Sequence, residues 1–301
     1  MHAGLMRVVE ECQPSSPNSP AGSSLTQVRH RDMPGGARGI AVRQTSRRVS
    51  RQPEYVKLSV VMAAYNAQGT VEQAVDEVLS VEYPCDVELI IVDDGSTDQT
   101  PDLLASITDP RVVTIRHGGS QGKGAALLSG IVAASGTHVL PFDADLEYLP
   151  DDILNLLEPV LTGRCSVVYG VRLFGYNTVY RSYLYAVGNR ILTRAANIMF
   201  GSCLSDLQTR LKLIPADLLR GLGIRETGFG VDTEISAALL RQGVRPFEVP
   251  VSYFGRTRGE GRKTTRRDAF RCLWILLRAR VQPRRNSLGQ QNNFTEPDDA
   301  G

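Results

Sequence analysis

Three acidic side chains alternate within the stretch "VLPFDADLEYLP" at residues 139–150. Asp143, Asp145 and Glu147 occupy every second position, and a strand of that spacing points all three carboxylates to one side. Like charges so close repel one another unless a cation lies between them. Oxygen ligands suit Mg²⁺ or Mn²⁺, so the pattern indicates a divalent-metal site. The alternative is a loop that begins with solvated acids.

Two other apolar runs of the chain also end in polar side chains. Tyr65 and Asn66 follow the first run, and Asp93 and Asp94 follow the second. In open parallel sheets, ligands bind beyond the carboxyl ends of the strands. Three such endings favour a shared ligand site over chance turns.

The segment "HGGSQGKGA" at residues 117–125 resembles a phosphate-binding loop but does not match one. The pattern GxxxxGK[ST] needs Gly at His117 and Ser or Thr at Gly124, and no GxGxxG follows the first strand, so a dinucleotide enzyme is disfavoured. Gly122 and Lys123 nevertheless open a predicted helix, where backbone donors and an ammonium could bind an anion. The alternative is a surface lysine.

Apolar periodicity predicts the elements that position these residues. Strands are expected at 57–66, 86–96, 111–117, 137–145, 165–172, 209–214 and 245–254. Helices are expected at 70–81, 97–107, 122–135, 150–161, 180–200, 231–243 and 266–280. This alternation predicts an α/β fold with a mostly parallel sheet covered by helices on both faces.

The overall charge of the 301-residue chain identifies no binding partner, since 34 basic and 32 acidic residues give a net charge of only +2. Residues 1–55 are rich in Ser, Pro and Arg, and together with residues 283–301 they are predicted to be disordered. Five cysteines without CxxC spacing favour a reducing compartment. No apolar run reaches about 18 residues and no signal peptide is recognisable, so a cytoplasmic location is predicted.

From about residue 57 to 280 the chain resembles the family-two glycosyltransferases with the A-type, Rossmann-like nucleotide-diphospho-sugar fold. Within that family it is most similar to the dolichyl- or polyprenyl-phosphate sugar synthases and their bacterial relatives. The resemblance rests on "SVVMAAYNAQGTV", "ELIIVDDGSTDQT", "SQGKGAALLSGI", "LPFDADLEYLP", "YGVR", "SDLQTRLKL", "GFGVDTEI" and "EVPVSYFGRTRGEGRKTTRRDAFRCLWILLR". It implies a transferase domain at 56–282, with a nucleotide-sugar half at 56–148 and an acceptor half at 149–282.

The resemblance also assigns roles to individual positions. Donor-binding residues are expected at Tyr65, Asn66, Asp93, Asp94, Gly122 and Lys123. Metal ligands for Mg²⁺ or Mn²⁺ are expected at Asp143, Asp145 and Glu147, with Asp145 as the direct contact and Asp143 facing the nucleotide ribose or the metal. Arg172, Arg181, Lys212 and Arg256 are the candidates for binding an acceptor phosphate, and Asp206 is a carboxylate expected near the acceptor. Asp143, Asp145 and Asp206 are the candidate catalytic residues.

Two positions depart from the family pattern after the first strand. The family usually has Pro-x-Tyr-Asn-Glu, whereas this chain has Ala63 and Ala67 at the first and last of these positions. Loss of the proline loosens the expected turn, and loss of the glutamate removes a carboxylate. A catalytically weakened nucleotide-sugar-binding protein is therefore an alternative to an enzyme.

The implied reaction is an inverting transfer of a sugar from a UDP- or GDP-sugar to a polyprenyl- or dolichyl-type lipid phosphate. A phosphate monoester is largely anionic at neutral pH and needs little help from a general base. Transfer to a sugar hydroxyl of a glycan or glycolipid is the alternative, for which Asp206, Asp232 or Glu234 would act as the base. Nucleic-acid binding is not expected, because no aromatic residues alternate with the amino-terminal basic run.

The basic helix predicted at 266–280 has two interpretations. It could lie on a membrane, with Phe270, Trp274 and Leu277 inward and arginines near the headgroups, or its apolar face could pack on the sheet. The sequence favours packing. A lipid acceptor would still place the protein peripherally on the cytoplasmic face of a membrane, and because relatives often carry transmembrane helices that this chain lacks, a membrane partner protein is a further candidate.

Overall fold

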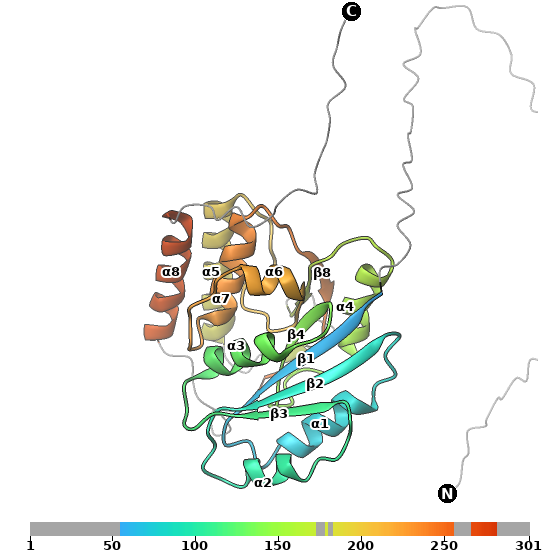
Figure 1. Ribbon diagram of the computed structural model, residues 1–301. Coiled ribbons are helices and arrows are strands. Elements are labelled where there is room, and N and C mark those ends of the chain that lie inside the picture. Colours follow the sequence, from blue (N-terminus) through green and yellow to red (C-terminus); the bar gives the residue numbers. More distant parts are fainter. Residues whose placement is uncertain (1–54, 173–177, 180–182, 256–265, 282–301) are drawn as a thin grey trace, which may run out of the picture. The chain divides into compact units, whose positions relative to one another are not determined.

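The computed structural model describes residues 55–172, 178–179, 183–255 and 266–281 (Figure 1). The predicted amino-terminal extension and carboxy-terminal tail lie outside the described residues. Two of the predicted acceptor-binding arginines, Arg181 and Arg256, lie outside them as well.

Four parallel strands form the first part of the central sheet. They are β1 (Lys57–Ala64), β2 (Asp86–Asp93), β3 (Val112–Arg116) and β4 (His138–Asp143), in the spatial order β3-β2-β1-β4. The helices that connect them are α1 (Val71–Ser80), α2 (Thr100–Ala105) and α3 (Lys123–Ala133). Helical crossovers between parallel strands were predicted from the alternating periodicity, and this part of the prediction is confirmed.

Three further strands complete a seven-stranded sheet in the order β3-β2-β1-β4-β7-β5-β8. β7 (Lys212–Pro215) runs antiparallel to both β4 and β5 (Val168–Val171), and β8 (Phe247–Pro250) is parallel to β5. The mostly parallel α/β fold is therefore confirmed. Because β4 pairs with β7, the sheet is continuous across the predicted boundary between the two halves.

The carboxy-terminal half differs from the prediction in three details. The strand expected at 245–254 is divided, since β8 ends at Pro250 and β9 (Tyr253–Phe254) pairs with β6 (Thr178–Val179) in a separate two-stranded sheet. The strand expected to begin at residue 209 begins only at Lys212. A short helix, α6 (Ala216–Gly221), was not predicted. These segments are too short for periodicity to resolve.

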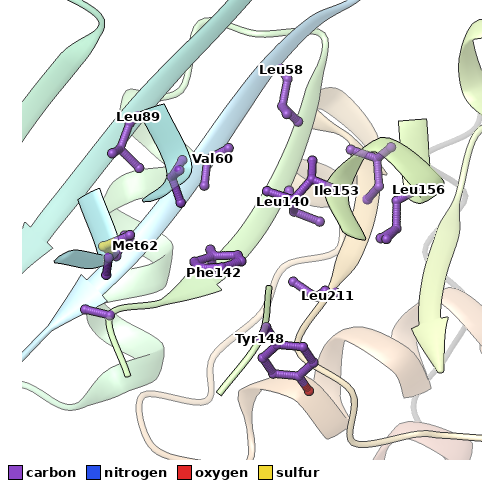
Figure 2. Packing of buried hydrophobic residues seen from close by; sticks show 14 of the residues in the cluster. Leu58, Val60, Met62, Leu89, Leu140, Phe142, Tyr148, Ile153, Leu156 and Leu211 are labelled. Carbon is purple, nitrogen blue, oxygen red and sulfur yellow. The ribbon is translucent and has the colours of Figure 1, made fainter. Parts of the chain in front are cut away.

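Alternating residues of β1 pack against opposite faces of the sheet. Figure 2 shows the cluster on one face, which contains Leu58, Val60, Met62, Leu140, Phe142, Ile153 and Leu156. Val61 faces the other way and packs against α3. A β-carbon added at Gly130 of α3 would lie 2.3 Å from Val61 Cγ1, so glycine is what lets this helix lie close to β1. That close approach holds α3, whose first residue is Lys123, against β1.

The two faces are covered by different helices (Figure 1). α1, α2 and α4 (Asp152–Leu161) contribute to one hydrophobic cluster, and α3, α6 and α7 (Val231–Arg241) contribute to the other. α5 (Tyr183–Phe200) and α8 (Arg266–Val281) pack against α7 and each other. Within the described part of the chain, no helix combines the length and apolar character needed to cross a membrane.

The orientation of α8 contradicts the expected packing of its apolar face. Cys272, Ile275, Leu276 and Ala279 are its buried residues. Phe270, Trp274 and Leu277 instead remain exposed at 73%, 65% and 46%. The interpretation that these three residues pack on the sheet is therefore wrong.

Candidate active site

The polar residues that were predicted to meet do lie at one edge of the sheet. β1, β2 and β4 are parallel, and in their registers Ala64 pairs with Asp93 while Ala63 pairs with Asp143. The carboxyl ends of these strands therefore lie side by side. Asp143 is the last residue of β4, and Tyr65 directly follows β1.

The first acid of the pattern, Asp143, is 9% exposed and is paired with two cations. Lys123 Nζ lies 2.8 Å from both of its carboxylate oxygens. Arg210 Nη1 contacts its Oδ2 atom and lies 3.6 Å from Asp145 Oδ2. Arg210 thereby bridges the two aspartates of the Asp-x-Asp pair.

The third acid is oriented differently from the first two. β4 ends at Asp143, and Leu146 adopts a φ of 59°, so the strand geometry that would align all three carboxylates does not continue to Glu147. Glu147 Oε2 accepts a hydrogen bond from the Tyr253 hydroxyl at 3.0 Å, and its carbonyl accepts one from the Phe254 amide. Glu147 therefore connects the acidic segment to β9, and its role as a metal ligand stays a prediction.

The donor set at Asp143 and Asp145 fits a divalent metal that is shared with a substrate. No cluster of three or more His, Cys, Asp or Glu side chains suited to a metal occurs among the residues that the structure describes. Mg²⁺ typically takes only one or two protein carboxylates and completes its shell with phosphate oxygens and water. Two aspartates at the ligand edge of the sheet supply that number.

Lys123 is the first residue of α3 and the cation nearest to Asp143 in the sequence-predicted set. Burial lowers the pKa of its ammonium from 10.5 to about 7, and the positive charge of Arg210 adds to this effect. Thr227 holds the start of α3 in place, since its carbonyl accepts hydrogen bonds from the Gly124 and Ala125 amides at 2.8 and 3.2 Å.

The backbone amides around the start of α3 are engaged within the protein. The Gln121 and Gly122 amides donate to the carboxylate of Asp94 at 2.9 and 2.8 Å. Asp94 also accepts a hydrogen bond from Ser120 and contacts His117 Nδ1, both at 2.8 Å. We expected these amides to bind an anion, but in the structure they donate hydrogen bonds to Asp94. Asp94 instead fixes the loop that presents Lys123.

The turn after β1 is held by side chains rather than by proline. The Asn66 amide donates to Ser96 Oγ at 2.9 Å, and Asn66 Oδ1 accepts from the Thr97 amide at 2.9 Å. The Ala67 amide donates to Thr100 Oγ1 at 2.8 Å. These bonds tie the turn to the loop after β2, so the absence of proline at Ala63 does not leave it unsupported. Tyr65 remains 52% exposed beside this turn.

Asp93, the last residue of β2, is buried at the same edge. Its Oδ1 atom accepts a hydrogen bond from the Ser96 amide at 2.9 Å. Its Oδ2 atom lies 3.3 Å from Arg116 Nε, a pair whose arginine is exposed. The donor-binding roles of Asp93 and Asp94 stay predictions, and both carboxylates are buried and hydrogen-bonded within the protein.

Two of the predicted acceptor-binding cations are buried and already paired. Arg172 forms a bidentate ion pair with Asp206, with Nε 2.7 Å from Oδ2 and Nη2 2.9 Å from Oδ1. Lys212 Nζ contacts the Thr209 carbonyl and lies 3.5 Å from Asp232 Oδ1. Both cations are at most 1% exposed, so neither is open to a phosphate in this conformation.

Arg210 is the site residue that sequence reasoning missed. It lies in "SDLQTRLKL", between Asp206 and Lys212, which were both selected. Nothing in the spacing of that segment indicates a contact with Asp143, which lies 67 positions earlier in the chain. One sequence feature could have indicated Arg210. It alternates with Lys212, with Arg210 just before a short strand and Lys212 within it.

A sequence model of a known family matches the same region of the chain. Residues 59–206, which include the Asp-x-Asp pair, match the glycosyl transferase family 2. This part of the chain, residues 59–206, belongs to glycosyl transferase family 2. The match supports the enzyme class predicted from the sequence, a glycosyltransferase.

Curated relatives of the chain include a succinoglycan biosynthesis protein and a glycosyltransferase. One is the succinoglycan biosynthesis protein ExoO of Rhizobium meliloti, 39% identical over 101 residues, which are 34% of this chain and 29% of the relative. Another is glycosyltransferase AglJ of Haloferax volcanii, 25% identical over 200 residues, which are 66% of this chain and 64% of the relative. The chain therefore spans less than two thirds of the length of either.

Solved structures support the A-type fold. Glucosyl-3-phosphoglycerate synthase from Mycobacterium tuberculosis, in complex with Mn²⁺, UDP and glucosyl-3-phosphoglycerate, has a TM-score of 0.57 and 22% sequence identity, covering 76% of this chain and 81% of that one. The same synthase with Mg²⁺ and UDP has a TM-score of 0.56 and 22% identity, covering 76% and 80%. At this identity the likeness establishes the fold alone.

Proposed function

We propose that this family 2 protein transfers a sugar, with inversion, from a nucleotide diphosphate to the phosphate of a polyprenyl-type lipid. The observation that carries the proposal is the meeting of Asp143, Asp145 and Lys123 at the carboxyl edge of the sheet. Cations and carboxylates at this edge are the groups that a metal-bound diphosphate requires. A UDP- or GDP-sugar is the expected donor.

The site residues have separate tasks in this reaction. Asp143 and Asp145 would hold Mg²⁺ or Mn²⁺, which when bound neutralises charge on the departing diphosphate. Lys123 places an ammonium beside the same oxygens, and preorganised cations of this kind stabilise charge that develops in the transition state. Tyr65, Asn66, Asp93 and Asp94 line the neighbouring strand ends and are assigned to the nucleotide.

The carboxylates considered as general bases favour a phosphate acceptor. Asp206 is paired with Arg172, Asp232 with Lys212, and Glu234 with Arg278. Burial raises the pKa of Asp206 and of Asp232, but the facing cations outweigh burial and keep both pKa values below the ordinary range. Such carboxylates are weak bases at neutral pH, and a phosphate monoester is the acceptor that can react without one.

Burial changes the proposed tasks of the acceptor-binding set. We assign Arg172 to positioning Asp206 and Lys212 to positioning Asp232, because each cation is enclosed with its carboxylate. Direct contact with the acceptor phosphate then falls to Arg181 and Arg256, which stand outside the described residues.

The exposed apolar and basic side chains of α5 and α8, here together called the α5–α8 surface, suit a lipid-linked acceptor. This surface includes the apolar side chains Tyr183, Ile191, Ile198, Phe270, Leu273, Trp274, Leu277 and Val281. Exposed arginines lie on the same two helices at Arg190, Arg194, Arg267, Arg271 and Arg280. Apolar residues flanked by arginines are typical of helices that lie in the interface of an anionic membrane. This surface supports a peripheral position on a membrane, where a polyprenyl tail would be found.

Transfer to a sugar hydroxyl is the second candidate, favoured by the name of the relative ExoO. Asp232 would then be the base, since it stands at the start of α7 with 7% exposure and close enough to Lys123 and Arg210 for their charges to lower its pKa. Removal of the Asp232 carboxylate distinguishes transfer to a hydroxyl from transfer to a phosphate. Asp232→Asn would abolish transfer to a hydroxyl, whereas transfer to a phosphate would lose far less.

The test is to incubate the intact chain with UDP- and GDP-sugars, Mn²⁺ or Mg²⁺, and polyprenyl phosphate, to identify the product by mass spectrometry, and to determine its anomeric configuration by nuclear magnetic resonance. We expect a sugar attached to the lipid phosphate, with the opposite anomeric configuration to the donor. Asp145→Asn is the control, since it removes one carboxylate of the acid pair and should abolish the product. Nucleotide binding without a glycolipid from any lipid phosphate would contradict the proposal, and transfer only to glycan hydroxyls would favour the second candidate.

A further inference from the structure

Arg210 takes the position between the two aspartates that a bridging cation would take. Its Nη1 atom contacts Asp143 Oδ2 and lies 3.6 Å from Asp145 Oδ2, so one guanidinium nitrogen faces one oxygen of each acid. The backbone holds the arginine nearby, because its amide donates to the Tyr148 hydroxyl at 3.4 Å. The side chain is 22% exposed, so part of it is accessible to solvent.

The charges at this position balance without any ligand. Asp143 and Asp145 contribute two negative charges, Arg210 contributes one positive charge, and Lys123 contributes a second when it is protonated. A free divalent cation would enter beside two positive charges and leave the cluster with a net charge of about +2. A metal that arrives with the diphosphate of a nucleotide sugar adds no net positive charge, and one that arrives with free UDP adds net negative charge, so the same entry becomes favourable.

We propose that Arg210 is a built-in counter-cation that makes metal binding at Asp143 and Asp145 depend on the nucleotide diphosphate. With no donor present, the guanidinium occupies the carboxylates and competes with free metal. When metal and diphosphate bind together, the guanidinium leaves the carboxylates for the phosphate oxygens, for which its planar fork of donors is well suited. This inference rests on the proposed binding of a nucleotide-sugar donor.

The proposal predicts a measurable quantity, the factor by which one ligand changes the affinity for the other, and this factor is reciprocal. If UDP raises the affinity for Mn²⁺ by some factor, then Mn²⁺ raises the affinity for UDP by the same factor. Arg210 contributes to that factor twice, by weakening the binding of free metal and by strengthening the binding of the metal–diphosphate pair. Its removal should therefore shrink the coupling factor, whatever happens to catalysis.

The experiment measures Mn²⁺ binding by electron paramagnetic resonance and UDP binding by calorimetry, each with and without the other ligand. We expect Arg210→Gln and Arg210→Ala to bind free Mn²⁺ about tenfold more tightly than the natural chain, within the usual range of coupling between sites. Their Mn²⁺–UDP coupling factor should fall by about tenfold or more. Arg210→Lys keeps the charge and should remain close to the natural chain.

Two controls separate this role from a structural one. Arg164→Ala removes an arginine whose partner is the half-exposed Glu158 on α4, and it should leave both affinities unchanged. Adding Asp145→Asn to Arg210→Gln should remove the gain in Mn²⁺ affinity, which assigns the gain to the acid pair. Circular dichroism confirms that each variant is folded, and the glutamine variant retains hydrogen-bonding capacity if the alanine variant does not fold.

Equal affinity of Arg210→Gln and the natural chain for free Mn²⁺ would overturn the proposal, and so would an unchanged coupling factor. Failure of the donor assignment gives a different result. In that case UDP binds to no variant, with or without Mn²⁺, while the comparison of free Mn²⁺ affinities still decides whether Arg210 competes with metal.

Discussion

Arg172 and Asp206 form a bidentate ion pair in the interior of the protein, with nitrogen–oxygen distances of 2.7 and 2.9 Å and at most 1% exposure on either side chain. The Asn189 amide group donates a third hydrogen bond to Asp206 at 2.8 Å, and the Tyr253 ring lies 5.1 Å from the guanidinium carbon. The pair joins the end of β5 to α5 and to the segment that precedes β7. This geometry gives the pair a structural role, which is to hold these segments together.

Arg172→Ala should therefore destabilise the fold. Removal of one partner leaves the Asp206 carboxylate buried without its cation, which costs about 3–5 kcal/mol of unfolding free energy. Replacing both partners with apolar residues, as in Arg172→Met with Asp206→Leu, should recover most of that loss. Urea unfolding followed by circular dichroism measures both values. If the single variant lost less than about 1 kcal/mol of unfolding free energy, the pair would not have this structural role.

Replacing Lys123 should impair donor binding and transfer without a comparable effect on folding. Lys123→Met removes the ammonium next to Asp143, and the loss of such a charge at a developing anion lowers kcat by about 10²–10³-fold. UDP binding should weaken in the same variant. Lys57→Met is the matched control, because Lys57 begins β1 at the opposite end of the strand from the site. Equal effects of the two variants on transfer would contradict the assignment of Lys123.

Gly124 should be intolerant of any side chain. A β-carbon there would lie 2.3 Å from the Glu226 carbonyl oxygen and 2.8 Å from the Thr227 carbonyl carbon, both backbone atoms that cannot move aside cheaply. Gly124→Ala should cost about 1–3 kcal/mol of stability through overpacking. It should also reduce donor affinity, because Lys123 would shift with the start of α3.

The control for this effect is Gly188→Ala. Gly188 lies within α5, and nothing stands within 4 Å of a β-carbon added there. That substitution should stabilise the protein by about 0.5–1 kcal/mol, because alanine is the better helix former. Thermal unfolding that ranked the two substitutions in the opposite order would contradict the close contact between α3 and the 226–227 segment.

The site residues that lie at the sheet edge expected from the sequence share one property, which is that they begin or end elements with a clear period. Asp93 and Asp143 close buried parallel strands, and Lys123 opens a helix, so local pattern and the geometry of parallel sheets together place them at one edge. The divided strand at 247–254 and the short α6 were missed because so few residues carry no measurable period.

Pairing between distant segments is what the sequence does not reveal. Arg172 and Asp206 were both selected, but as two groups that meet an acceptor rather than each other. Arg210 was passed over, although it forms ion pairs with both aspartates of the Asp-x-Asp pair. These contacts depend on how β7 enters the sheet between β4 and β5, and a single sequence gives no measure of that register.

Glu88 should make stability depend on acid pH. Burial raises the pKa of its carboxyl, but hydrogen bonds from Ser59 and Ser135 outweigh burial and lower the pKa from 4.5 to about 2. Since the folded pKa is the lower one, its contribution is complete above about pH 5 and is lost as the pH falls toward 2. We expect a loss on the order of 2 kcal/mol from this residue across that interval.

The measurement is the free energy of unfolding in urea between pH 5 and pH 2 for Glu88→Gln and for the natural chain. The variant should have a flatter pH profile, because the titrating group is absent. Glu82→Gln, at an exposed position shortly before β2, is the matched control and should follow the natural profile. Parallel profiles for the Glu88 variant and the natural chain would rule out this contribution.

The α5–α8 surface should bind anionic vesicles. Trp274 and Leu277 are 65% and 46% exposed on α8, and burial of such side chains in the interfacial layer is worth about 1.5–3 kcal/mol each. Trp274→Glu combined with Leu277→Glu should therefore lower vesicle binding by at least about tenfold for each side chain lost. Val132→Glu is the control, since Val132 is a 78% exposed apolar residue on α3, away from this surface.

Flotation with phosphatidylcholine vesicles, with and without phosphatidylserine, distinguishes the two contributions to this binding. Arginines such as Arg267 and Arg280 should make recovery depend on the anionic lipid and fall with added salt, because exposed charges are screened within about 10 Å at 0.1 M. The apolar variants should reduce recovery at every salt concentration. If the double variant floats as well as the Val132 control, the surface has another occupant, and an oligomer that the same variant dissociates would identify that occupant as a second copy of the chain.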